Sequence, residues 1–381
     1  MIRLIRYIEF TIGDFLCLIA SRFKRGAAIP APPRSILIIR DWSLGESLLA
    51  LPVLKRTKEH FPGAKITVLV TASSKPVFID QPFIDKIITF NFWNILQLLL
   101  SWNRYDICLD MMPYFRHSAL IGFWCSRFTV GFDTFPKRSA LYDHRIPFDD
   151  SVHMVHVFDE FYIWGKFTAK RLESLHSREI QDRELKALLD QPGMKIGIHL
   201  GTEKTAPWRA WAFDNFRTVI ESLLKKYPGI TIFLSGSAAE ADLTGMMEKA
   251  IEDKRVINLA GRINLFELAF LMKKLDLYVS NDTGPMHVSA SMGCKTIGLF
   301  GPNTPIRFGP FPLERNIALY NPPPGYTPSI NVHRGEFGDS RQDRKLSVVN
   351  RIRPETVISE IERALRESIG KGTTGKGTQR P

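Results

Sequence analysis

Residues 276–302 read DLYVSNDTGPMHVSASMGCKTIGLFGP, and this stretch decides the fold class of the chain. The apolar run 277–279 is typical of a buried strand, and the small residues of 288–292 favour a closely packed helix. A second apolar run follows at 296–300. Strand, tight turn, helix and strand in succession predict one unit of a parallel α/β sheet. Its turn then lies at the edge where such sheets bind ligands.

The turn within this stretch has the chemistry of an anion site. We expect the backbone N–H groups of Thr283 and Gly284 at the positive end of the following helix, and Gly284 has no side chain to keep a phosphate away. Asp282 accepts hydrogen bonds and His287 can donate one. The same short string is also a common turn and helix cap, so a purely structural role stays open.

The alternation of strands and helices continues through most of the chain. Expected strands lie at 35–40, 66–71, 86–90, 107–110, 128–131, 195–199, 230–235 and 256–259, and expected helices at 46–61, 94–101, 151–189, 213–227, 238–251 and 265–274. Gln191-Pro192-Gly193 interrupts the pattern, which then restarts. This predicts an α/β protein with two Rossmann-like domains facing each other across a cleft.

The expected organisation has five segments. They are an N-terminal amphipathic segment and linker (1–33), a first Rossmann-like domain (34–189), a second one (190–350), a C-terminal helix (351–369) and a disordered tail (370–381). The apolar stretch 2–20 is interrupted by charged residues and has no convincing cleavage site, which argues against a spanning helix and a signal peptide. An interfacial helix on an anionic membrane and a helix packed on the first domain are the two alternatives.

The formal net charge of +12 fits an anionic partner. Because no nucleic-acid-binding motif occurs, we expect no nucleic acid and favour a membrane surface or a phosphorylated lipid. The cysteines Cys17, Cys108, Cys125 and Cys294 have no metal-ligand spacing and lie in or near apolar runs. They predict buried thiols in a reducing cytosol, and no metal site is expected.

Several loops that follow expected strands carry residues suited to catalysis or anion binding. The carboxylates Asp41 and Glu46 follow the first strand, and Arg209 could hold a diphosphate through its planar guanidinium. Each has an ordinary alternative: Glu46 as a partner of the helix dipole, Arg209 as a surface residue. Further candidates with such alternatives are Glu240 (a helix cap), Ile263 (core) and Arg116 (a solvated loop).

Residues 276–302, with weaker support from 36–54 and 197–211, resemble the glycosyltransferase family that contains the lipopolysaccharide heptosyltransferases. The resemblance implies a GT-B fold, with the nucleotide-sugar donor on the later domain and the acceptor on the earlier one. It also implies an inverting reaction without metal or other cofactor, ADP-heptose as the donor and an anionic glycolipid such as the lipopolysaccharide core as the acceptor. The expected location is the cytoplasmic face of the inner membrane, bound peripherally.

The resemblance also implies residue roles. Glu46 stands where the family has its general base, an Asp, and Asp41 is the second candidate for this role. Arg40 would orient the carboxylate or bind an acceptor phosphate, and Arg116 would face the acceptor. The remaining implied donor contacts are the hydroxyl of Thr205, Arg209 in place of a family Lys, Glu240 on the ribose, Ile263 on the adenine, and Asp282, Thr283, Gly284 and His287 in the turn.

Two rival functions remain compatible with the sequence. A hydrolysing nucleotide-sugar epimerase would release free sugar without an acceptor. A non-catalytic nucleotide-sugar or membrane-surface binding protein would bind a donor without turnover. An NAD dehydrogenase is disfavoured, because no Gly-x-Gly-x-x-Gly follows the first strand.

Overall fold

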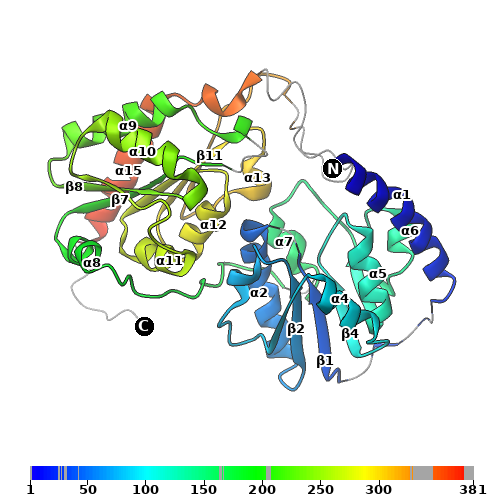
Figure 1. The fold of residues 1–381 in the computed structure, drawn as a ribbon. Coiled ribbons are helices and arrows are strands. Elements are labelled where there is room, and N and C mark those ends of the chain that lie inside the picture. Colours follow the sequence, from blue (N-terminus) through cyan, green and yellow to red (C-terminus); the bar gives the residue numbers. More distant parts are fainter. Residues whose placement is uncertain are drawn as a thin grey trace. The chain divides into compact units, whose positions relative to one another are not determined.

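The chain forms two compact units in a computed structural model. The residues described are 2–24, 26, 28–29, 32–41, 43–162, 165, 167–202, 207–326, 328 and 346–372, with backbone alone for 2–8 and 368–372. One unit contains the described residues up to Glu173 and the other those from Ser174 on (Figure 1). The sequence pattern placed this boundary later, at 189/190, but the helix α8 (Arg183–Asp190) belongs with the second unit.

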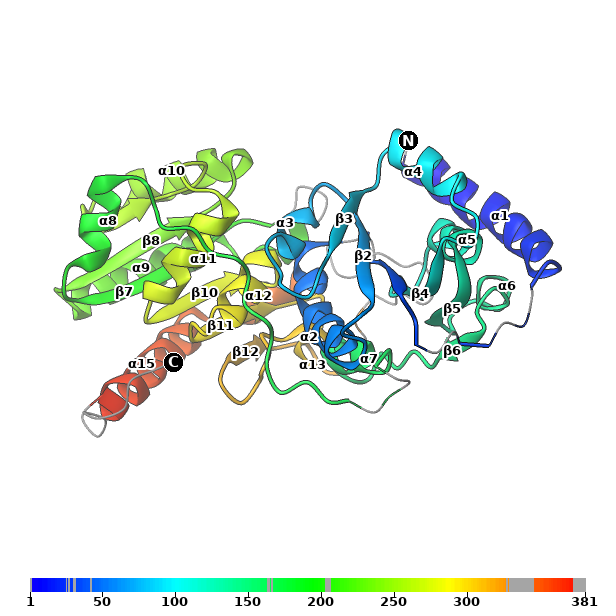
Figure 2. The ribbon, with the colours of Figure 1, turned by 90° about the horizontal axis from the view of Figure 1, so that it is seen from below.

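The first unit is built on six parallel strands in the order β3-β2-β1-β4-β5-β6. The strands are β1 (Ser35–Ile39), β2 (Lys65–Val70), β3 (Lys86–Thr89), β4 (Tyr105–Asp110), β5 (Ser126–Phe132) and β6 (His144–Ile146). The helices are α1 (Ile2–Ser21), α2 (Leu44–His60), α3 (Lys75–Phe78), α4 (Phe92–Leu99), α5 (Arg116–Cys125), α6 (Pro136–Ser139) and α7 (Met154–Asp159). Figure 2 shows α4, α5 and α1 over one face of the sheet, and α2 and α7 over the other.

The second unit repeats this architecture in the order β12-β11-β10-β7-β8-β9. Its strands are β7 (Met194–His199), β8 (Ile230–Ser235), β9 (Val256–Asn258), β10 (Leu277–Asn281), β11 (Thr296–Phe300) and β12 (Ile317–Tyr320). Beside α8, its helices are α9 (Phe213–Lys226), α10 (Ala241–Ile251), α11 (Leu265–Lys274), α12 (Gly284–Ser291), α13 (Pro305–Phe308) and α15 (Pro354–Gly372), with short 3₁₀ turns at Pro207–Arg209, Ala238–Glu240 and Val348–Arg351. In chain order, each sheet has the Rossmann arrangement 3-2-1-4-5-6.

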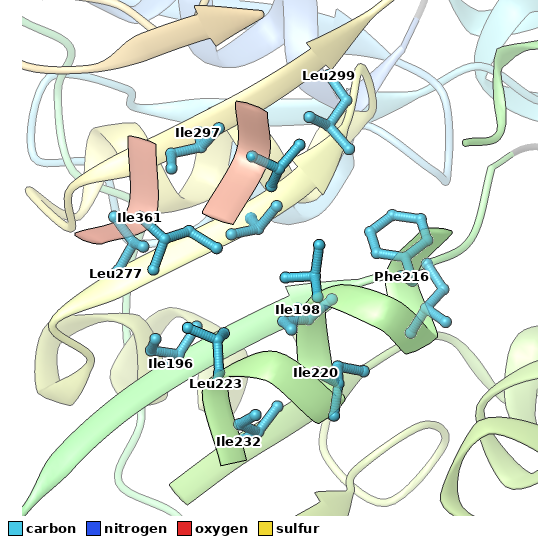
Figure 3. Close-up of a cluster of buried hydrophobic side chains, with 14 of the residues drawn as sticks. Ile196, Ile198, Phe216, Ile220, Leu223, Ile232, Leu277, Ile297, Leu299 and Ile361 are labelled. Carbon is cyan, nitrogen blue, oxygen red and sulfur yellow. The ribbon is translucent and has the colours of Figure 1, made fainter. Parts of the chain in front are cut away.

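The core of the second unit explains why its strands read as continuous apolar runs. Side chains of β7, β8, β10 and β11 pack against α9 and α15 on one face, for example Ile198 against Ile220 and Phe216 (Figure 3). The other face is covered too, because a Cβ placed on Gly298 of β11 would strike Met286 of α12. A parallel sheet covered on both faces requires apolar residues at successive positions.

The expected α/β class and the pair of Rossmann-like units are confirmed. The strand 296–300 and the helix 265–274 begin and end at the expected residues, and the four cysteines are free and buried. The short strands β6 and β12 were not expected. The linker predicted within 1–33 falls partly on residues outside the described ranges, and so does the tail predicted at 370–381, from 373 on.

The prediction of one continuous helix over 151–189 is wrong. Only α7 and α8 are helical there, and the chain between them has no regular secondary structure in its described residues. The buried side chains between α7 and α8 are Phe161, Ala169, Leu172, Leu175 and Ile180. Three of them are spaced three residues apart, a spacing that a helix also produces, so the pattern alone did not separate the two structures.

Candidate active site

The first group of candidate residues follows β1, at the carboxyl edge of the first sheet. Arg40 is fully buried, with its guanidinium over the ring of Phe158, and its Nη1 donates to the carbonyl oxygen of Met111 at 3.2 Å. Its Nη2 donates to Oε2 of Glu46. Of the two roles implied for Arg40, the structure therefore shows the contact with the carboxylate. The buried guanidinium has no exposed surface for an acceptor phosphate.

Glu46 lies in the first turn of α2, where the helix dipole favours a negative charge. Ser43 caps this helix by accepting a hydrogen bond from the Glu46 backbone N–H at 3.3 Å. The Glu46 side chain is 23% exposed although its partner Arg40 is buried. A carboxylate that is held by a buried cation and still reaches solvent is suited to take a proton from a bound hydroxyl.

Asp41, the other candidate base, is held differently. Its Oδ2 lies 2.7 Å from Nε2 of His117, and the other nitrogen of that ring, Nδ1, lies 3.2 Å from Oε1 of Glu9 on α1. Burial lowers the pKa of His117, but the hydrogen bonds and negative charges of Asp41 and Glu9 outweigh burial and raise the pKa to about 10. Asp41 is thus neutralised by an imidazolium and is only 6% exposed.

Arg116 is buried under α1. Its Nε donates to Oδ1 of Asp14 at 2.8 Å, and its guanidinium lies between the rings of Phe10 and Phe135, 4.1 and 4.2 Å from their centroids. The acceptor contact expected for Arg116 would need an exposed guanidinium, and this one is covered because α1 packs on α5. Of the two alternatives for residues 2–20, packing on the first unit is observed.

The second group of candidates lies at the carboxyl edge of the second sheet, where the turn before α12 meets two other loops. Arg209 donates from Nη2 to Oδ2 of Asp282 at 2.5 Å and to its carbonyl oxygen at 2.6 Å. Asn303, after β11, donates to the same carboxylate oxygen at 2.5 Å. Within the described residues, Nε of Arg209 is buried without a hydrogen-bond partner. The Arg209 side chain as a whole is 22% exposed, so another part of its guanidinium can still meet an anion.

Asn281, the last residue of β10, ties these loops together. Its Nδ2 donates to the carbonyl oxygens of Leu200 and Gly201 at 2.8 and 3.3 Å, and its Oδ1 accepts from the Trp211 backbone N–H at 3.0 Å. Asn281, Asn303 and His117 were not singled out from the sequence. In the sequence, these three residues are marked only by position: they lie at or just after the end of an expected strand, or next to a residue already chosen as a candidate.

Glu240 has two roles at the end of β8. Its Oε2 accepts from the backbone N–H and the hydroxyl of Ser237, which completes a capping box. Its Oε1 lies 3.6 Å from Nε2 of His199 and passes over Gly201, where any Cβ would overlap it. Burial lowers the pKa of His199 more than the Glu240 carboxylate raises it, so this imidazole is neutral at neutral pH.

The remaining candidates differ in exposure. Thr283 and Gly284 are half-buried at the start of α12, and the Thr283 hydroxyl donates to the carbonyl oxygen of Asn281 at 3.3 Å. His287 is buried on α12, and Ile263 is half-buried in the loop before α11. Thr205 lies outside the described residues.

Two kinds of feature are absent from the part of the chain that the structure describes. No group of three or more His, Cys, Asp or Glu side chains in these residues could hold a metal ion. Within the same ranges, no helix combines the length and apolar character needed to cross a membrane.

Sequence comparisons connect the chain to one family. The family model described as glycosyltransferase family 9 (heptosyltransferase) matches residues 95–331. The lipopolysaccharide core heptosyltransferase OpsX of Haemophilus influenzae is 25% identical over 347 residues, which cover 87% of this chain and 94% of that protein. The lipooligosaccharide heptosyltransferase 2 of Haemophilus ducreyi is 23% identical over 358 residues, covering 87% and 99%.

Solved structures show the same fold. The E. coli ADP-heptose lipopolysaccharide heptosyltransferase II superposes with a TM-score of 0.68 at 18% identity, covering 88% of this chain and 99% of that one. A family 9 glycosyltransferase of Veillonella parvula superposes with a TM-score of 0.69 at 21% identity, and the match covers 88% of this chain and 97% of that one. The E. coli heptosyltransferase WaaC, solved with ADP, superposes with a TM-score of 0.64 at 18% identity, and the match covers 87% of this chain and 99% of that one. The expected GT-B class is thereby confirmed.

Proposed function

This chain belongs to glycosyltransferase family 9, the heptosyltransferase family, and is an enzyme of the glycosyltransferase class. From this premise we propose that it transfers a heptose from ADP-heptose to the lipopolysaccharide core or a similar anionic glycolipid. The proposed reaction inverts the anomeric carbon and needs no metal. We propose that the enzyme works on the cytoplasmic face of the inner membrane as a peripheral protein.

The observation that carries the proposed donor site is the cluster of Arg209, Asp282 and Asn303 beside the first turn of α12. Two donors fix the Asp282 carboxylate, and the Arg209 side chain remains 22% exposed beside it. A nucleoside diphosphate would bind to this guanidinium and to the amides of Thr283 and Gly284. The WaaC structure with ADP is of the same family and supports ADP as the nucleotide.

We assign the general base to Glu46. In the proposed step Glu46 takes the proton of the acceptor hydroxyl, and the oxygen attacks the anomeric carbon of the donor sugar. The bond from that carbon to the β-phosphate oxygen breaks at the same time, and ADP leaves with its new negative charge. Arg209 and the α12 amides offset that charge. Arg40 is a positioning residue, because it contacts Glu46 and not the acceptor.

The other assignments concern donor recognition. We propose that Glu240 holds the ribose through Oε1, the oxygen that the capping box leaves available. The hydroxyl of Thr205 would add a phosphate contact, Ile263 would pack on the adenine, and His287 would support the turn from α12.

A turnover assay tests the proposed function. The full-length protein is incubated with ADP-heptose, with or without a lipopolysaccharide that lacks core heptose, in the presence of a metal chelator. We expect ADP release that requires the acceptor, and a gain of one heptose in the mass of the glycolipid. Release of free heptose without acceptor would instead identify a hydrolase. Donor binding without ADP release at any acceptor would identify a non-catalytic protein.

A further inference from the structure

The outward face of α1 is apolar, the reverse of an ordinary surface helix. The exposed large apolar side chains are Ile12, Phe15, Leu16, Leu18 and Ile19 of α1 and Phe23 just after it, and Phe15 is 60% exposed. Their spacing places them along one side of the helix. Asp14 is the only charged residue between positions 10 and 21, and its carboxylate pairs with the buried Arg116.

The inward face of α1 is fixed by specific contacts. The apolar side chains on its outward face are therefore exposed although the helix is already packed on the first unit. Oε1 of Glu9 accepts from the backbone N–H of His117 at 3.1 Å. Cys17 is fully buried in a cluster with Tyr142, and a Cβ placed on Gly13 would lie only 2.7 Å from Cβ of Arg116. Rolling the helix to bury its apolar side would break all of these contacts.

Helix α4 extends the apolar surface on the same face of the first sheet (Figure 2). Phe92, Trp93 and Leu100 are 74%, 70% and 81% exposed. Half-buried side chains of α5 lie between α1 and α4, and the exposed Trp102 and Trp124 pack edge to face with ring centroids 4.3 Å apart. We call the exposed side chains of α1 and α4, with these two tryptophans, the apolar face.

Basic side chains border the apolar face at one end. Arg22 follows α1, and Arg104 and Arg127 follow the two tryptophans in the sequence; all three are exposed. An open hollow there is lined by Phe23, Trp102 and Arg127. Aromatic and aliphatic side chains flanked by cations match the interface of an anionic bilayer, where rings lie at headgroup depth and cations meet phosphates.

We propose that the apolar face docks on an anionic phospholipid bilayer, with α1 lying along its surface. This inference rests on the proposed function, because a glycolipid acceptor is held in such a bilayer, and it assigns the surface that meets the lipid. A second copy of the chain fits less well, since its own apolar face carries the same three cations and would offer them no opposite charge. Through Glu9 and His117, α1 is also connected to Asp41, in the loop before the helix α2 that carries Glu46.

Vesicle flotation tests the proposal. The full-length protein is mixed with vesicles of phosphatidylethanolamine and phosphatidylglycerol that contain no glycolipid, or with vesicles of phosphatidylcholine alone. The variants are Phe15→Gln/Ile19→Gln on α1 and Trp93→Gln/Leu100→Gln on α4. Met246→Gln/Ile306→Gln is the matched control, because both residues are 60% exposed apolar side chains of the second unit.

We expect the wild type and the control to float with phosphatidylglycerol vesicles, and each test variant to bind at least about tenfold more weakly. Binding to phosphatidylcholine should be weaker, and added salt should weaken binding to the anionic vesicles. Equal flotation of all variants, or none by the wild type, would overturn the proposal. So would a wild-type dimer in sedimentation velocity that the α1 variant converts to monomer.

Calorimetric titration of the same preparations with ADP separates this inference from the function on which it rests. ADP binding without vesicle binding rejects the docking surface alone. Vesicle binding without ADP binding rejects the donor site and retains the surface. Because α1 and α4 belong to the first unit and the proposed ADP site to the second, an unchanged thermal unfolding midpoint would show that the α1 and α4 variants are folded.

Discussion

Nε2 of His117 lies 2.7 Å from Oδ2 of Asp41, so one of the two candidate bases is already engaged by a cation. The pKa of this imidazole is raised to about 10, and it is therefore protonated at neutral pH. Glu46, five residues further on, reaches solvent beside the buried Arg40. This difference between two nearby carboxylates is the reason for assigning the base to Glu46.

The first prediction concerns Glu46→Gln. The amide has the same size and its oxygen can still accept from Arg40, but it cannot take a proton at neutral pH. We expect turnover to fall by about 10²- to 10⁴-fold while ADP affinity stays within twofold, as measured by ADP release and calorimetry. Asp41→Asn is the matched control, and its loss should be smaller. A larger loss for Asp41→Asn than for Glu46→Gln would move the base to Asp41.

The second prediction concerns pH and the Glu9–His117–Asp41 network. Because the folded state holds the His117 proton more tightly than the unfolded state, the network contributes its full stabilisation below pH ~6.5. That contribution is lost as the pH rises towards the folded pKa of about 10. We expect the free energy of unfolding to fall by about 1–3 kcal/mol over this range, a value discounted because the ring is partly exposed to solvent.

Denaturant unfolding between pH 6 and pH 10 measures this change. His117→Asn should flatten the dependence, since it removes the titrating group and leaves the fold of α5. An unchanged slope in that variant would show that other groups cause the pH dependence.

The third prediction concerns Gly201. A methyl group there would overlap the Glu240 carboxylate, so Gly201→Ala should displace Glu240 from His199. If Glu240 holds the ribose, ADP affinity should fall about tenfold, the effect of losing one charge-assisted hydrogen bond. Gly229→Ala is the control in the same unit, because nothing lies within 4 Å of its added Cβ. Unchanged ADP affinity in Gly201→Ala would remove Glu240 from the donor site.

Local sequence patterns predicted most of the fold, because the buried parallel strands form continuous apolar runs. The strand 296–300 and the turn at Asp282, which follows such a run, were predicted from this pattern. The short strands β6 and β12 were not expected, since each has only three or four residues. The stretch between α7 and α8 has apolar residues at helical spacing, and yet those of its residues that the structure describes form no helix.

The candidate site was predictable only where its chemistry is local. Asp282 stands out because it follows a strand directly, and Glu46 because it lies in the first turn of the helix after the first strand. The partners that decide their environment come from distant positions: His117 is 76 residues from Asp41, and Arg209 is 73 residues from Asp282. Arg116 was expected at the acceptor, but Glu9 and Asp14 of α1, more than 100 residues earlier, cover it. No local pattern contains that information.

The most direct test of the central claim is a calorimetric titration of the full-length protein with ADP, UDP and GDP, without added metal. We expect selective binding of ADP, and an affinity about 10- to 100-fold lower in Arg209→Gln, because the variant lacks the charged contact to the diphosphate. Selective binding of UDP or GDP would contradict ADP-heptose as the donor. ADP affinity unchanged in Arg209→Gln, or no binding of any nucleotide, would contradict the donor site itself.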